Sequence, residues 1–232
     1  MVRTRSRPAP PGQLRANGTR WTARFEAILN GTKKGDWATR SAKKTIGLAL
    51  RGLAHGKCVY CESVLGVTVD LEVDHYVAKT VNSALTFEWT NLLPSCRLCN
   101  RPKLDHDHSN ALLKPDDEDP EPFFWIHPDT GRLEPHPTLS APDRYRAEAT
   151  IRLCDLQRAP LCTRRIHMLG RTNRWLRQVA AAEALTSTLR EEWTSLSNPA
   201  SEYKFVLRHA LALHGRDDLA QFDRERFSQE RP

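Results

Sequence analysis

The sequence has no apolar run that approaches the roughly 18 residues of a transmembrane helix. Its basic N-terminus is not followed by the apolar stretch of a secretory signal, and it shows no internal repeat. These absences lead us to expect a cytoplasmic protein that does not associate with a membrane. At 232 residues the chain can form one large domain or two small ones around a well-developed core.

Acidic residues are scarce at the start of the chain. Residues 1–57 contain 13 Lys or Arg but only two acids, Glu26 and Asp36, which leaves a net charge of −4 on the remainder and +7 overall. A basic segment attached to a near-neutral body fits a polyanionic partner such as nucleic acid. Arginines within residues 3–24 would contact phosphates without reading a sequence. A solubilising tail with solvated helix faces would produce the same charge pattern.

Cysteines are also few, six in all, but four of them form two C-x-x-C pairs. In a cytosolic protein such pairs indicate metal or redox chemistry, because thiols there are kept reduced. Cys58 with Cys61 and Cys96 with Cys99 are separated by 34 residues and predict a tetrahedral zinc site that clamps the segment between them. Zinc binding and folding would then be linked. A redox-active pair and four core cysteines are the alternatives.

The first 57 residues predict a tail and two helices. Residues 1–20 are rich in Arg, Pro and Gly without an apolar period, so we expect them to be mobile. A short helix is expected over residues 21–29, where an Asn-Gly pair stops it. A longer helix is expected from Asp36, as its N-cap residue, to about Ala54.

The middle of the chain predicts a strand followed by a short helix. Residues 67–73 alternate apolar and polar, which predicts a strand with one buried face and Asp74 and His75 at its end. Neighbouring residues on a strand point to opposite sides, so these two would flank one reacting group. A helix is expected from Cys96 or Cys99 past Lys103, offset by a proline at 102.

The last half of the chain predicts a connector, a hairpin and helices. The acidic, proline-rich residues 114–122 are expected to be a solvated connector, and residues 123–133 a hairpin with a turn around 129–131. Beyond Pro142 the apolar period is helical, with one long helix running through Trp193 and another over 203–213. The aromatic residues on these helices are expected to be core.

Polar residues between and just after the cysteine pairs are of the kinds that phosphodiester hydrolysis needs. Asp74 is a hard oxygen ligand for Mg²⁺ or Mn²⁺, Asn100 supplies a second oxygen, and His75 can take a proton from water near neutral pH. Asn91 is expected to tie down the loop and to orient the His75 ring through its amide. Lys103, one helical turn after Asn100, would face a phosphate. Each residue alone also suits a structural role, but the set predicts a metal-dependent nuclease.

This region resembles the HNH nucleases with a ββα-metal fold, in their four-cysteine, zinc-stapled form. The residues that carry the resemblance are CVYCE at 58–62, EVDHYVAK at 72–79 and EWTNLLPSCRLCN at 88–100. More narrowly, these motifs are similar to those of the HNH subunits of bacterial anti-phage systems of the Septu and retron type. The resemblance implies a structural zinc on the four paired cysteines and an ATPase subunit as a partner.

The resemblance also implies roles for single residues. It places the general base at His75, the catalytic metal ligands at Asp74 and Asn100, and the middle asparagine of the motif at Asn91. The third motif position, often His, is Asn100 here, and this neutral amide is a weaker ligand than imidazole for transition metals. Mg²⁺ or Mn²⁺, rather than tightly bound Zn²⁺, is therefore expected at the catalytic site.

We predict an α+β, mostly α-helical protein in which a small zinc-stapled ββα-metal core lies between helical regions. The expected regions are a basic flexible tail (1–20), a helical region (21–57), the nuclease core (58–110), an acidic connector with a hairpin (111–141) and a C-terminal helical region for partner docking (142–232). The expected function is hydrolysis of nucleic-acid phosphodiester bonds, of DNA in the first place, in phage defence. The alternative is a non-catalytic zinc module that binds nucleic acid or a protein.

Two further sets of residues have weaker signals. Cys154 and Cys162 lack the paired spacing and are expected to be ordinary buried cysteines. His106 and His108 lie just after Lys103 and suit either metal binding or a polar loop.

Overall fold

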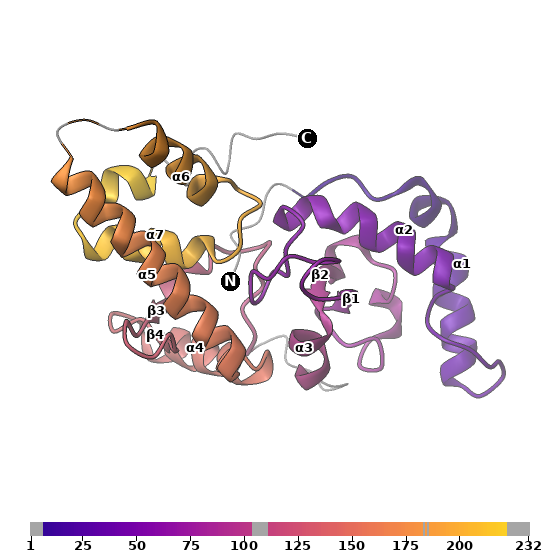
Figure 1. The fold of residues 1–232 in the computed structure, drawn as a ribbon. Coiled ribbons are helices and arrows are strands. Elements are labelled where there is room, and N and C mark those ends of the chain that lie inside the picture. Colours follow the sequence, from indigo (N-terminus) through magenta and orange to yellow (C-terminus); the bar gives the residue numbers. More distant parts are fainter. Residues whose placement is uncertain (1–6, 104–110, 183, 185, 222–232) are drawn as a thin grey trace.

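The computed structural model describes residues 7–103, 111–182, 184 and 186–221, which form two halves lying side by side (Figure 1). The N-terminal half contains α1 (Gly12–Leu29), α2 (Arg40–Arg51), β1 (Leu71–His75), β2 (Leu92–Cys96) and α3 (Arg97–Asn100). The C-terminal half contains β3 (Phe124–Ile126), β4 (Leu133–Pro135), α4 (Ala141–Leu153), α5 (Ala159–Ala181), α6 (Ser187–Ser197) and α7 (Lys204–Leu213). Short 3-10 helices lie between them: η1 (Gly52–Ala54), η2 (Ser83–Leu85), η3 (Trp89–Asn91), η4 (Arg101–Lys103) and η5 (Glu121–Phe123). The predicted α+β, mostly helical fold is confirmed.

Helix α1 begins earlier than the sequence pattern predicted. Pro11 precedes it with φ near −60°, and Leu14 in its first turn is buried. Arg7 is anchored as well, since its guanidinium donates hydrogen bonds to the carbonyl oxygens of Trp89 and Leu92. The expectation of a mobile tail is therefore wrong for residues 7–20, and residues 1–6 lie outside the described part of the chain.

Helix α2 is capped by a different residue from the one predicted. The Thr39 hydroxyl accepts a hydrogen bond from the Ala42 amide, which satisfies one of the free N–H groups at the start of the helix. Asp36, the expected cap, instead accepts from the neighbouring Trp37 amide. The helix therefore starts at Arg40, and the segment before it is free to carry Trp37 toward β1.

Strand β1 begins four residues later than predicted and contains Asp74 and His75. Residues 66–68 form a turn instead, in which the amide and hydroxyl of Thr68 both donate to the Val64 carbonyl, and Val69 makes an isolated bridge with Leu65. β1 pairs antiparallel with β2. α3 follows β2 at once and passes into η4, where Pro102 offsets the helix as expected. These elements form the predicted ββα unit.

The acidic segment is not the solvated connector that its composition predicted. The Asp116 side chain is only 4% exposed and pairs with Arg7. Glu121 forms a buried ion pair with Arg208 of α7. Arginines from distant parts of the chain compensate these carboxylates, so the segment packs against both halves.

The predicted long helix through Trp193 is broken. α5 ends at Ala181, and α6 starts at Ser187 after a cap in which the Thr186 hydroxyl accepts from the Leu189 amide. The two helices still meet, because the rings of Trp175 and Trp193 stack with centroids 4.9 Å apart. The β3–β4 hairpin is confirmed, with Gly131 at a positive φ of 64°.

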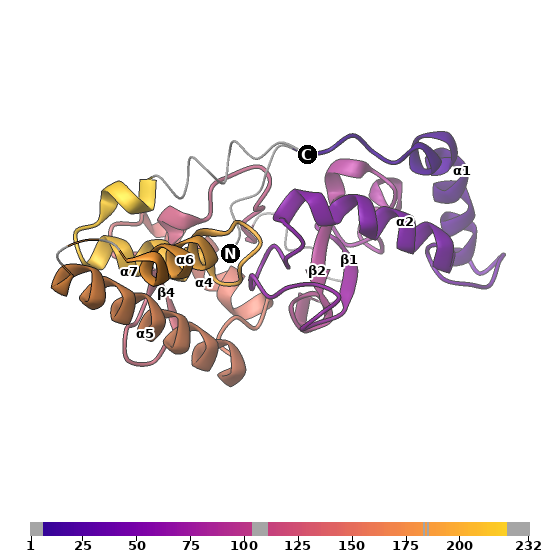
Figure 2. The same cartoon turned by 45° about the horizontal axis from the view of Figure 1, so that its top comes forward.

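The largest cluster of buried apolar side chains joins the two halves. It contains the four paired cysteines together with residues such as Leu53, Leu112, Phe124, Leu161 and Tyr203. Helices α4–α7 keep to one side of the β1–β2 pair in both views (Figure 2). Among the described residues no helix is long and apolar enough to cross a membrane.

Candidate zinc and active site

The four paired cysteines meet in the core between the halves. The sulfur atoms of Cys58, Cys61, Cys96 and Cys99 lie within 4.8 Å of one another, and all four residues are buried. Four thiols at this spacing match the tetrahedral coordination of a structural zinc ion. Arg158, at the start of α5, directs its guanidinium at Cys99 Sγ from 3.5 and 3.6 Å. A positive charge at that place offsets part of the negative charge of a tetrathiolate.

Hydrogen bonding and burial shift the pKa values of the four thiols in opposite directions. Hydrogen bonds with neighbouring thiols, Cys58 first, lower the pKa of Cys61. Hydrogen bonds with Cys58 and Cys99 lower the pKa of Cys96. Burial raises the pKa of Cys58 and Cys99. A lowered pKa favours the thiolate, which is the form that binds zinc. Cys154 is buried outside this cluster and Cys162 is half-buried.

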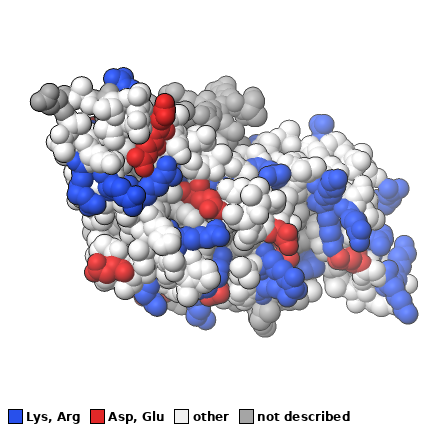
Figure 3. Space-filling view, in the orientation of Figure 1, with Lys and Arg blue, Asp and Glu red and all other residues white. Residues whose placement is uncertain are grey.

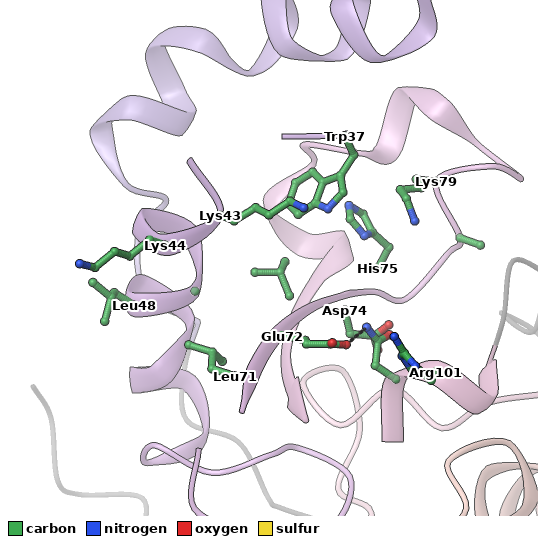
Figure 4. Close-up of a pocket in the computed structure, with 14 residues that line it drawn as sticks. Trp37, Lys43, Lys44, Leu48, Leu71, Glu72, Asp74, His75, Lys79 and Arg101 are labelled. Carbon is green, nitrogen blue, oxygen red and sulfur yellow. Dashed lines mark hydrogen bonds between the residues drawn. The ribbon is translucent and has the colours of Figure 1, made fainter. Parts of the chain in front are cut away.

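A cavity of about 750 Å³ opens beside β1, between α2 and α3. Alternate residues of β1 face opposite walls, as the strand period requires. Figure 4 shows His75 with Trp37 and Lys43 on one side of the strand, and Glu72 and Asp74 with Arg101 on the other. The cavity thus has an aromatic and imidazole wall opposite a wall of oxygen donors.

The His75 ring is held by a backbone carbonyl. Its Nε2 lies 3.0 Å from the Thr86 oxygen, and because a carbonyl only accepts, Nε2 carries the proton. The lone pair then resides on Nδ1. The Trp37 ring packs edge-on against the imidazole at 4.7 Å between centroids. Burial, followed by the positive charge of Lys79, lowers the pKa of His75 to about 4, so the ring is neutral at physiological pH.

Asn91 ties down the loop after β1 but does not bond the ring. Its Oδ1 accepts from the Val77 amide, and its Nδ2 donates to the carbonyls of Val77 and Leu85. The expected direct contact with His75 is therefore corrected: Thr86 makes it. Thr86 directly follows Leu85 in the chain. The hydrogen bond from Asn91 to the Leu85 carbonyl therefore fixes the backbone segment whose Thr86 carbonyl accepts from His75.

Asp74 lies in a buried group with two other polar side chains. Lys103 Nζ is 2.6 Å from Asp74 Oδ2 and 2.8 Å from Oδ1, and the Tyr60 hydroxyl donates to Oδ2 at 2.6 Å. Burial and the charge of Asp74 raise the pKa of Tyr60, so it stays protonated and donates. Lys103 thus faces the carboxylate, and its expected role at a phosphate remains a prediction.

Asn100 also lines the cavity. Its Nδ2 donates to Glu72 Oε2 at 2.9 Å, which leaves the amide oxygen available as a donor to a metal. Asp74, Asn100 and Glu72 form a hard, oxygen-only set, which suits Mg²⁺ or Mn²⁺. Within the described residues, the four cysteines form the one group of three or more His, Cys, Asp or Glu close enough to share an ion. A catalytic ion here would therefore retain several waters, as Mg²⁺ commonly does.

Positive side chains surround the cavity. Lys43 and Lys44 of α2, Lys79 and Arg101 all line it. Figure 3 shows Lys and Arg gathered over the α1–α2 end of the molecule, with few acids among them. The surface around the site therefore suits a polyanion.

Several site residues escaped the sequence analysis. Glu72 had a usable signal, because its place two residues before Asp74 on a strand puts both on one face. Tyr60 lies inside the first C-x-x-C pair. Trp37, Lys43 and Thr86 gave no signal, since only the packing of α2 and the loop before β2 brings them to His75. His106 and His108 lie outside the described residues.

The segment that carries the cysteine pairs and most of the cavity residues is similar in sequence to known proteins. The family model described as HNH endonuclease matches residues 58–106. The Septu protein PtuB of Bacillus thuringiensis is 37% identical over 102 residues, which cover 44% of this chain and 37% of that protein. The Septu protein PtuB of Bacillus mycoides (strain KBAB4) is 32% identical over 97 residues, covering 34% of this chain and 33% of that protein. The chain therefore matches about a third of the length of these curated relatives, and it carries an HNH endonuclease domain at residues 58–106.

Proposed function

We propose that the chain is a metal-dependent endonuclease that hydrolyses nucleic-acid phosphodiester bonds at the cavity beside β1. One observation carries the proposal: a neutral imidazole of defined tautomer lines the same cavity as two carboxylates and an amide oxygen. A base next to hard oxygen ligands is the combination that hydrolysis of a phosphodiester requires. The match of residues 58–106 to the HNH endonuclease family supports it.

His75 is proposed as the general base. Thr86 fixes the proton on Nε2, so Nδ1 is the nitrogen that accepts a proton from the attacking water. The lowered pKa keeps Nδ1 unprotonated throughout the physiological range. Trp37 restricts rotation of the ring, because the indole and the imidazole pack at an interplanar angle of 87°.

Asp74 and Asn100 are proposed to hold the catalytic ion, with Glu72 positioning the Asn100 amide. A divalent cation bound there would stabilise negative charge on the scissile phosphate and the leaving oxygen. Lys43, Lys44, Lys79 and Arg101 line the cavity and would hold neighbouring phosphates.

The biological setting is proposed from similarity. Likeness to the Septu PtuB proteins supports a role in bacterial anti-phage defence, and the resemblance implies an ATPase partner. DNA is the proposed substrate, and the basic α1–α2 surface supports a nucleic-acid substrate in general.

A non-catalytic zinc module is the second candidate. The buried Asp74–Lys103 pair favours it, since a pure scaffold would hold its carboxylate in this way.

The test is cleavage of plasmid DNA by the purified chain with Mg²⁺ or Mn²⁺. We expect His75→Asn to abolish cleavage while its zinc content and circular dichroism match the parent protein. His167→Asn, at an exposed position on α5, is the matched control and should cut normally. Full cleavage by His75→Asn would contradict the assignment, and a parent protein that binds zinc but never cuts, with or without an ATPase partner, would favour the scaffold.

A further inference from the structure

A second cavity adjoins the catalytic one on the far side of Trp37. Its volume is about 520 Å³, and it lies between α1 and the segment that leads into α2. Its walls include Trp21 and Trp37, and its other polar lining residues are the cations Arg20, Arg24 and Lys33 with Thr39. As far as the structure describes the chain, this cavity is therefore aromatic with a positive rim and has no acid in its lining.

Trp37 links the two cavities. It lines both of them, and its ring contacts the His75 imidazole at 4.7 Å between centroids. Lys43 lies over the same indole, 5.5 Å from its centroid, and lines the catalytic cavity. Lys43 also pairs with Asp36, so the indole of Trp37 and the Lys43 stem, rather than a row of unpaired cations, connect the two cavities.

The aromatic walls are held in place from behind. Trp21 and Trp37 both pack against Phe87, with ring centroids 5.3 and 5.4 Å apart. Trp37 is 8% exposed and Phe87 is 6% exposed, so this support belongs to the core. A rigid aromatic surface of this kind costs little to organise when a flat ligand stacks on it.

Resting on the proposed nuclease function, we propose that this second cavity receives one unstacked nucleobase of the substrate. An aromatic wall recognises the face of any base, and a cationic rim recognises the phosphates on either side of it. Charge decides the occupant, because an apolar side chain of a protein partner would need none of the three cations. Inside a duplex the base is stacked and paired, so the cavity selects single-stranded nucleic acid or a base extruded from a helix.

The proposal is tested by binding in metal-free buffer, where no cleavage occurs. The probes are a fluorescent single-stranded 12-mer DNA, the same sequence as a duplex, and a 12-mer of abasic residues, read by anisotropy. We expect the parent protein to bind the single strand about tenfold more tightly than either of the other probes, as stacking of one base allows. Equal affinity for the three probes, or no binding of any, overturns the proposal.

Substitutions distinguish the contribution of base stacking to affinity from that of the phosphate contacts. Trp21→Leu keeps an apolar side chain but cannot stack, so it should lose the preference for the single strand, whereas Trp21→Tyr should retain it. Lys33→Gln should weaken all three probes alike and reduce the salt dependence by about one ion. Trp125→Leu, on the β3–β4 hairpin, is the control and should bind like the parent protein. Trp21→Leu with an unchanged preference overturns the proposal.

The experiments distinguish a wrong base-binding proposal from a wrong assignment of the catalytic site. If the parent protein cuts DNA but shows no preference for single strands, only the base cavity is wrong. If it prefers single strands through Trp21 but His75→Asn does not change cleavage, only the catalytic assignment is wrong.

Discussion

The ammonium group of Lys103 lies 2.6 Å from Oδ2 of Asp74, and both side chains are almost wholly buried. The chain therefore supplies its own cation to the carboxylate that we propose as a metal ligand. A divalent ion that binds Asp74 must compete with Lys103 or share the carboxylate with it. The pair thus connects the stability of the ββα unit to the occupancy of the proposed site.

Lys103→Met is expected to lower the free energy of unfolding by roughly 3 kcal/mol in metal-free buffer, because it leaves the Asp74 charge buried without a cation. The double variant Lys103→Met with Asp74→Asn should recover most of that loss. Millimolar Mn²⁺ should stabilise Lys103→Met more than the parent protein, since the ion replaces the missing charge. Urea denaturation measures each value. Equal destabilisation of the single and double variants would show that the pair is not coupled.

The buried imidazole predicts how stability depends on pH. His75 has a pKa of about 4 in the folded protein, lowered by burial and by Lys79, against 6.5 for the free side chain. Since the unfolded chain takes up the proton first, stability is complete above pH 6.5 and falls as the pH drops toward 4. The loss amounts to about 3 kcal/mol for this group.

The measurement is the free energy of unfolding of the parent protein and of His75→Asn from pH 7.5 to 4.5. The variant should show a flatter curve over this window, while acid effects on the cysteines cancel between the two proteins. Parallel curves would sink the idea that a buried neutral His75 contributes to the pH dependence.

Zinc is expected to be part of the core. The cysteine cluster lies within the group of apolar residues that joins the two halves, so removing the metal should unfold both together. Elemental analysis should find one zinc per chain, and Cys96→Ser should lose it along with the cooperative thermal transition. Cys162→Ser, a half-buried cysteine outside the cluster, is the matched control and should keep its zinc. A stable Cys96→Ser protein without zinc would refute the structural role.

The N-terminal segment is expected to contribute to stability through Arg7. Its guanidinium bonds the carbonyls of Trp89 and Leu92 and pairs with Asp116, which is 4% exposed. Arg7→Ala should therefore cost roughly 2 kcal/mol, because it leaves buried acceptors unpaired. Arg15→Ala, at an exposed position of α1, should cost little. Equal unfolding free energies for the two variants would mean that the Arg7 contacts contribute nothing.

Local chemistry was sufficient for part of this protein. The spacing of the two C-x-x-C pairs predicted a metal cluster, and the structure brings the four sulfur atoms within 4.8 Å. The helix of α3, its offset at Pro102 and the β3–β4 turn also followed from short-range signals. Such signals act over a few residues and so can be read along the chain.

Competing local contacts defeated other predictions. Thr68 turns the chain at Val64, so β1 starts later than its alternating pattern suggested. Thr39 rather than Asp36 caps α2, and Thr186 starts a new helix where the apolar period continued. In each case a hydroxyl hydrogen bond accompanies an element boundary that the sequence pattern did not predict.

By itself the sequence determined the ligand types, their order and the ββα unit, because cysteine spacing and a strand followed by a helix are local properties. Only the tertiary structure decided that Thr86 orients His75, that Lys103 pairs with Asp74, and that Trp37 separates two cavities. His75 and Thr86 are 11 positions apart in the chain, Asp74 and Lys103 are 29 apart, and Trp37 and His75 are 38 apart. The packing of whole elements brings each pair into contact. Arg7 and Asp116 of the acidic segment are 109 residues apart and pair only in the folded protein. Charged side chains that the composition alone would place in solvent are thus buried where the fold supplies a partner of opposite charge.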